Sequence, residues 1–208
     1  MKAFALVAAV AVGAGAAPAG GAKTYQASPI EQAYRAGKAE GDDAAARAHF
    51  QRGIDLARTA LTGTPDAPDA LLWLAANLAG EALTHGKLFA LRVIPEIEAT
   101  LLRLERVAPA YDHAAAARAL ANLYWKAPAL ISVGSSKKAE AYFQTALARA
   151  PAFPGNQAMA AAFYAGRRDC ARARPLAEAV ARRSDLDAFG PDAAEWRRLA
   201  DEVRRDCR

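Results

Sequence analysis

The chain of 208 residues contains two cysteines and 24% charged side chains, and it is long enough for one domain with a hydrophobic core. Alanine dominates and β-branched residues are scarce, which favours an all-α fold over a β fold. The formal net charge of +5 comes from arginines that gather late in the sequence, but acids are interspersed among them, as on solvated helix faces. No nucleic-acid partner is therefore expected.

The start of the chain, residues 1–19, has the order of a secretory signal peptide. Lys2 supplies a positive charge, the stretch 3–12 is apolar and too short to span a bilayer, and small residues follow. Two A-x-A sites predict cleavage after Ala19 or, as a second choice, after Ala16. We therefore expect a periplasmic or secreted protein that is not inserted in a membrane after cleavage.

Beyond the signal peptide, we expect a flexible lead over 20–30 and one helical repeat domain over 31–208. Helical patterns alternate there with short breakers rich in Gly, Pro, Ser and Asp. Most pairs join a helix rich in small residues to one with apolar residues three and four apart, so each pair needs neighbours to bury both faces. We predict an α-solenoid of about four hairpins with a C-terminal capping helix. The expected helices are 28–38, 43–62, 69–86, 90–108, 111–127, 136–150, 155–166, 170–183 and 192–206.

Three consecutive units match the 34-residue tetratricopeptide pattern. In that pattern small residues let helices cross closely, aromatic residues fill the space between hairpins, and proline follows the second helix. We therefore expect a tetratricopeptide-like core that also contains Trp73. The matching positions are Leu101, Leu104 and Pro109, then Leu120, Ala121, Tyr124, Ala139, Phe143, Ala146 and Pro151, then Tyr164, Ala173, Ala177 and Val180.

The unit that ends at Pro151 is longer than the pattern, because its turn carries the extra segment APALISVGSS. The run ARALANLYWKAPALISVGSSKKAEAYFQTALARAPAFPGN resembles the T-component proteins that accompany TRAP transporters, which share LY-x-x-AP, GS-x-x-KA and F-x-x-AL-x-x-AP. Upstream, WLAANLAGEALTHGK and PEIEATLLRLERVAPAYDHA fit the same arrangement, so the resemblance covers roughly residues 30–185. It implies a helical fold around a central cavity and a partner role beside an extracytoplasmic solute-binding protein. T-components are typically lipoproteins, whereas no cysteine lies near the predicted cleavage sites.

No combination of residues predicts catalysis, a cofactor or a metal site. His49, His85 and His113 lie on separate units, and none has a second ligand at metal-binding spacing. The motifs G-x-S-x-G and H-E-x-x-H and the glycine-rich nucleotide fingerprints do not occur. We therefore expect a protein that is not an enzyme. Four acids are interpreted as charges that complement helix N-termini: Asp42, Asp43, Glu96 and Glu98.

The segment VGSSKK over 133–138 has two interpretations. Its glycine, hydroxyls and lysines could hold an anion against the backbone N–H groups of a helix start. The alternative, which we favour, is that Ser135 or Ser136 caps the helix while both lysines point to solvent.

A partner-binding face is predicted on the helix over 111–127. Its members recur three and four residues apart, and an arginine, an amide and an indole have the composition of a binding hot spot. The arginine and asparagine resemble half of the clamp with which some tetratricopeptide domains hold a peptide's C-terminal carboxylate. The tryptophan has a second interpretation, as a core residue beneath the ALISVG turn, and both stay open. The face consists of Arg118, Asn122, Trp125 and Lys126.

These features predict a binding scaffold with a protein partner in the periplasm or cell envelope. A carrier that encloses a small, partly apolar ligand in its central cavity is the alternative.

Cys170 and Cys207 are predicted to form a disulfide, because they are the only cysteines and the expected compartment is oxidising. The predicted helices 155–166, 170–183 and 192–206 alternate in direction. The start of the second and the end of the third should therefore meet at the same rim of the solenoid.

Overall fold

The computed structural model describes residues 26–208, which fold into nine α-helices and no strand. The all-α fold predicted from the sequence is therefore confirmed for this part of the chain. The predicted signal peptide and the first residues of the predicted lead lie outside the described residues. The helices are α1 (Pro29–Ala39), α2 (Asp43–Gly63), α3 (Pro68–His85), α4 (Lys87–Val107), α5 (Tyr111–Lys126), α6 (Ser136–Arg149), α7 (Pro154–Gly166), α8 (Cys170–Ala181) and α9 (Ala193–Asp206), with a 3-10 turn, η1 (Leu186–Phe189), before α9.

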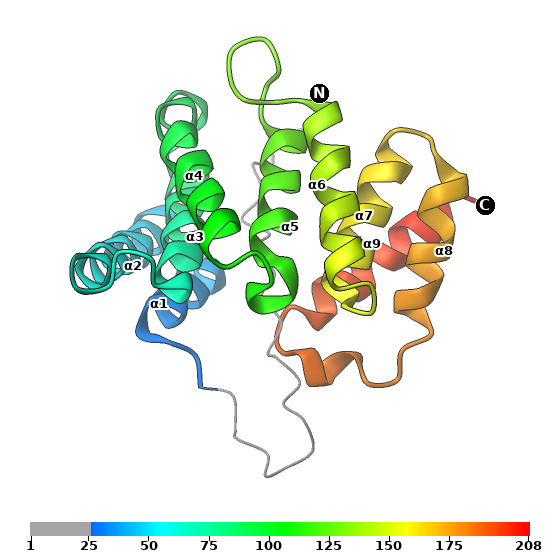
Figure 1. Cartoon of the computed structure of the whole chain (residues 1–208), viewed down its shortest axis with the longest axis horizontal. Helices are drawn as coiled ribbons and strands as arrows, with labels where there is room; N and C mark the ends of the chain where they lie inside the picture. The colour runs from blue at the N-terminus through cyan, green and yellow to red at the C-terminus, as the bar shows by residue number, and fades with distance from the viewer. Residues whose placement is uncertain (1–25) are drawn as a thin grey trace.

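Consecutive helices pack as four antiparallel hairpins, α1–α2, α3–α4, α5–α6 and α7–α8. Figure 1 shows the hairpins following one another across the molecule. The last helix, α9, packs against both α7 and α8 and covers the end of the array. This arrangement is the predicted solenoid of hairpins with a capping helix.

Local residue choices explain where the helices begin. The side chains of Ser28, Asp42, Ser135 and Asp169 accept backbone N–H groups in the first turns of α1, α2, α6 and α8. Three helices start with proline, which lacks the N–H that would otherwise be unpaired: α1, α3 and α7. The interpretation of Ser135 as an N-cap is therefore confirmed.

The interpretation of Glu96 and Glu98 as N-terminal charges is wrong, because α4 begins at Lys87 and both acids lie inside it. Pro95 lies inside α4, and the helix continues through it, in agreement with the predicted range 90–108. Instead, the Glu98 carboxylate accepts the Tyr124 hydroxyl at 2.7 Å, which ties α4 to α5.

The core includes the positions that the repeat pattern predicts. Small residues among them permit close helix packing, and the aromatic rings fill the space between hairpins. The core positions predicted from the repeat pattern are each at most 3% exposed, and so is Trp73: Leu101, Leu104, Leu120, Ala121, Tyr124, Ala139, Phe143, Ala146, Tyr164, Ala173, Ala177 and Val180.

The first two hairpins approach each other closely around Phe50 of α2. A Cβ atom added at Gly37 of α1 would lie 2.6 Å from this ring, and one added at Gly80 of α3 would lie 2.5 Å from it. Both distances are far below van der Waals contact, so any side chain at either glycine would displace the ring. The two glycines therefore set how tightly α1, α2 and α3 pack.

The array curls back on itself, so that its first helix contacts its last. Lys38 of α1 lies 3.4 Å from a carboxylate oxygen of Glu195 and 3.6 Å from one of Asp192. Arg35 also lies 3.6 Å from Asp192, which is only 7% exposed. These ion pairs join residues at opposite ends of the sequence and close the solenoid.

The predicted disulfide is confirmed: Cys170 at the start of α8 is bonded to Cys207 just after α9, with 5.3 Å between the Cα atoms. The bond holds the capping helix to the last hairpin. None of the helices described here is long and apolar enough to cross a membrane.

Candidate binding site

The predicted face on α5 does not form one exposed surface. Arg118 is fully buried and Asn122 is 4% exposed, whereas Trp125 and Lys126 are half-buried. The expectation that all four residues line an open groove is therefore wrong for the first two. The physical reason is that α7 packs against this side of α5 and covers it.

Arg118 is held in the interior by polar groups from the chain itself. One guanidinium nitrogen donates to the Asn156 side-chain oxygen at 2.9 Å and to the His113 carbonyl at 3.3 Å. The other lies 3.4 Å from the Asp112 carboxylate, and the guanidinium also stacks on Phe153. Burying a charge is tolerated when it is paired and hydrogen-bonded in this way.

Asn156 of α7 connects the Arg118 network to the backbone around it. Its amide nitrogen donates to the carbonyl groups of His113, Ala146 and Ala150 at 3.0 to 3.2 Å. The backbone of residues 112–114 is left-handed, with φ between 43° and 63°, a conformation that costs free energy in residues with a side chain. The contacts of Arg118 and Asn156 with the His113 carbonyl stabilise this turn.

The charge of Asp112 is disfavoured despite its arginine partner. The pKa of this carboxyl is raised to about 7, chiefly by burial and additionally by the negative charges of Glu31 and Asp192. Arg118 opposes the shift without cancelling it. Burial likewise lowers the pKa of Arg118, although the nearby carboxylates oppose that change.

Asn122 and Trp125 also serve the packing of α5. The Asn122 amide donates to the Arg118 carbonyl at 3.0 Å, within the helix. Trp125 meets the rings of Phe143 and Phe163 edge-on, with centroid distances of 6.3 and 5.7 Å. The geometry thus favours the second interpretation of Trp125, as a core residue between α6 and α7. Lys126 lies over the same ring, 3.4 Å from its centroid.

The four most exposed large apolar side chains lie elsewhere, on the loop between α5 and α6 and around the facing turn between α3 and α4. We call this surface the apolar rim, formed by Leu83, Leu88, Leu130 and Ile131. Their exposed fractions are 40%, 86%, 98% and 69%. Exposed apolar residues that cluster in this way mark binding surfaces more often than scattered ones do.

A hollow of about 280 Å³ lies within the apolar rim. Its walls are almost entirely apolar. The α3–α4 hairpin forms one side and the loop forms the other. The apolar residues that line it include Leu83, Ala90, Leu91, Ile94, Pro128 and Ile131.

The protruding loop is held in shape at its base. The Ser135 N–H donates to the Tyr124 carbonyl at 2.8 Å, which brings the two ends of the loop together. Gly134 packs on the chain at Ala127, where an added Cβ would lie 2.0 Å from the carbonyl oxygen. Because the base is closed, the tip at Leu130 is presented outward without a partner in the described chain.

This loop was predicted from the sequence as an extra segment, but no binding surface was predicted on it. The signal that could have identified it is the pair Leu130 and Ile131, which stands between Pro128 and Gly134 rather than within a helical pattern. Two adjacent large apolar residues at the middle of a long turn have no neighbouring helix to cover them.

The histidines lie on three separate surfaces. His49 lies 3.3 Å from Glu40, His85 stacks on Phe89, and His113 stacks on Phe153. Over residues 26–208, no group of three or more His, Cys, Asp or Glu side chains is placed to hold a metal ion. Compared with protein-family models and with curated proteins, the chain matches none.

Proposed function

We propose that this chain is an exported, non-enzymatic scaffold that binds a protein partner of the periplasm or cell envelope at its apolar rim. The observation that carries the proposal is the 98% exposure of Leu130 at the tip of a closed loop beside an apolar hollow. Removing such surface from water stabilises a complex without requiring any change in the scaffold.

The dimensions of the apolar rim favour a protein as the partner. A cavity of about 150 Å³ already accommodates a benzene ring, so the hollow of about 280 Å³ has room for a large apolar side chain. Leu88 and Leu130 lie outside the residues that line the hollow, so a small molecule seated inside would leave them exposed. A partner surface can fill the hollow and cover both.

The charges beside the apolar rim suggest the chemistry of that partner. Lys87 lines the edge of the hollow, and Lys137 follows the loop at the exposed start of α6. Positive charges at the edge of an apolar interface favour partners with carboxylates in matching positions. We expect an apolar side chain flanked by acidic residues.

The location and the family resemblance support the same proposal. The signal-like sequence at residues 1–19 and the disulfide are compatible with export to an oxidising compartment. The resemblance to T-components of TRAP transporters adds a specific form of the proposal, in which the partner is an extracytoplasmic solute-binding protein.

Site-specific cross-linking in the periplasm tests the partner. A photoactivatable residue at position 130 is expected to capture one protein, and the same residue at the exposed Arg52 of α2 is expected not to. Leu88→Ser with Ile131→Ser should weaken binding of the captured protein by about tenfold, or about 1.4 kcal/mol. Unchanged binding, or equal capture from position 52, would contradict the proposal.

Export is tested separately by N-terminal sequencing of the periplasmic protein. We expect it to begin at Gly20 or at Ala17. Periplasmic protein that retains Met1 would contradict cleavage, and protein found only in the cytoplasm would contradict export.

A carrier function is the second candidate, and the apolar walls of the hollow favour it. It predicts a small apolar molecule bound to the purified protein. Native mass spectrometry distinguishes the two: a retained ligand that is lost in Ile131→Ser supports a carrier, and protein without one supports the scaffold.

A further inference from the structure

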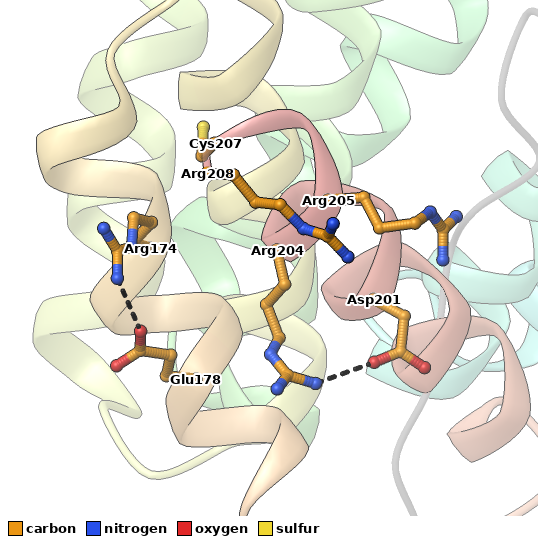
Figure 2. A pocket seen from close by; sticks show the side chains of 7 residues that line it. All are labelled: Arg174, Glu178, Asp201, Arg204, Arg205, Cys207 and Arg208. Carbon is orange, nitrogen blue, oxygen red and sulfur yellow. Dashed lines mark hydrogen bonds and ion pairs between the residues drawn. The ribbon is translucent and has the colours of Figure 1, made fainter.

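A second hollow, of about 430 Å³, lies between α8 and α9, and it is lined by charged side chains. Figure 2 shows these side chains around the hollow, on the two helices and on the residues just after α9. They are four arginines and two acids: Arg174 and Glu178 of α8, Asp201, Arg204 and Arg205 of α9, and Arg208.

The charges of this hollow do not balance within it. Arg174 lies 3.5 Å from the Glu178 carboxylate, and Arg204 lies 3.2 Å from that of Asp201. Both acids are thereby paired, and Glu178 is in addition shared with Arg182. Arg205 and Arg208 make no ion pair with any residue of 26–208, so the lining side chains have two more positive than negative charges.

Helix electrostatics explain only part of this arrangement. The partial negative charge at the C-terminus of α9 favours arginines in its last turn, which accounts for Arg204 and Arg205. It does not account for Arg174, which faces them from α8, or for Arg208, whose side chain extends toward them (Figure 2). The set therefore has the geometry of a cationic receptor rather than of a helix end alone.

The walls of the hollow are held together covalently. Cys207 lines the hollow and is bonded to Cys170 at the start of α8, so the last turn of α9 cannot separate from α8. Val203 and Ala200 anchor the opposite face of α9 in the core. Rigid walls reduce the conformational entropy that the backbone loses when a ligand binds, which makes a small ligand sufficient.

We propose that the α8–α9 hollow binds a phosphate monoester through its arginines. A guanidinium group presents paired N–H donors that match two oxygens of a phosphate. A phosphate monoester has a charge of about −1.5 to −2 at pH 7, which matches the excess charge of the lining side chains. The hollow is concave, which suits a single phosphate group, either on a soluble molecule or on a lipid headgroup that enters it.

Calorimetric titration of the full mature chain with glycerol phosphate and with inorganic phosphate tests this site. We expect saturable binding to the wild type that weakens about tenfold or more in Arg205→Gln with Arg208→Gln. The matched control removes two arginines of the same helix outside the hollow, Arg197→Gln with Arg198→Gln, and should bind as the wild type does. Absence of saturable binding, or equal loss in both variants, would overturn the proposal.

Vesicles identify the source of the phosphate. Binding to phosphatidylcholine vesicles that contain phosphatidic acid, competed by inorganic phosphate and lost in Arg205→Gln with Arg208→Gln, supports a lipid headgroup. Phosphate binding without vesicle binding supports a soluble ligand. Vesicle binding that the control variant reduces equally indicates a nonspecific basic surface and overturns the site.

Discussion

Helix α5 and the loop that follows it reverse the usual partition between the interior and the surface of a protein. In the middle of the helix, the charged Arg118 is fully buried, whereas the loop exposes Leu130 to 98%. The buried charge has partners from its own chain, namely Asp112, Asn156 and the His113 carbonyl. The exposed leucine has none in the described chain. Polar residues on the inner face of a repeat can thus stabilise the fold, whereas apolar residues in a turn remain accessible.

The largest effect is expected from removing the buried charge. Arg118→Met keeps the shape but leaves the Asp112 carboxyl and the Asn156 side-chain oxygen without their partner, and it should lower the free energy of unfolding by about 3–5 kcal/mol. Denaturant unfolding followed by circular dichroism measures this change. A loss below about 1 kcal/mol would show that the buried Arg118 network contributes little to the free energy of unfolding.

The disulfide allows the same kind of stability measurement at a region away from α5 and its loop. Cys170→Ser with Cys207→Ser should lower the free energy of unfolding by about 3–4 kcal/mol, because the bond closes a loop with a sequence separation of 37 residues. The same denaturant experiment measures it, and reduction of the wild type should reproduce the loss. Cross-linking from position 130 should persist under conditions in which the variant stays folded, since the apolar rim lies on other helices.

The Asp112 carboxyl predicts how stability depends on pH. Its folded-state pKa of about 7 exceeds the ordinary value of 3.8, so the folded chain holds this proton where the unfolded chain has lost it. Stability contributed by this group should therefore fall as the pH rises through that interval, by at most about 1.4 kcal/mol per pH unit.

The control for this pH dependence is Asp112→Asn, which cannot titrate. The stability that His113 contributes should change with pH in the opposite sense, because burial lowers the pKa of its imidazole. The difference between the wild-type and variant unfolding curves from pH 4 to pH 8 isolates the carboxyl. Parallel curves would show that Asp112 keeps an ordinary pKa.

The smallest effect on stability is expected at the exposed tip of the loop between α5 and α6. Leu130→Ser should change the free energy of unfolding by no more than about 0.5 kcal/mol, because its side chain has almost no contacts to lose. Leu120→Ala is the matched control, since the buried leucine of the same hairpin should cost about 2–5 kcal/mol. A large loss in Leu130→Ser would mean that the loop tip contributes to the fold rather than to binding.

Local residue patterns determined most of the fold. Capping residues such as Ser135 and Asp169, prolines at helix starts, and apolar residues three and four apart each act within one turn of helix, so they are readable from the chain. The start of α4 was less readable: the helix begins at Lys87, three residues before the predicted start at 90, and no side chain caps its first turn.

The candidate site was less predictable, because exposure depends on neighbours distant in sequence. Arg118 and Asn122 have the spacing of an open face, and only the approach of α7 buries them. Leu130 and Ile131 have an apolar composition that suggests a core, but they lie in a turn that no helix covers. Spacing defines which residues share a side of a helix, and it does not define what lies against that side.

The sequence alone determined the helical class, the approximate positions of the helices, the repeat core and the pairing of Cys170 with Cys207. These follow from interactions within a hairpin or between adjacent hairpins, whose geometry is nearly constant in helical repeats. The tertiary structure decided the closure of α1 onto α9 and which polar residues are buried. It also decided where the two hollows open. Those features depend on the curvature accumulated over all the repeats, which small packing differences at each interface set jointly.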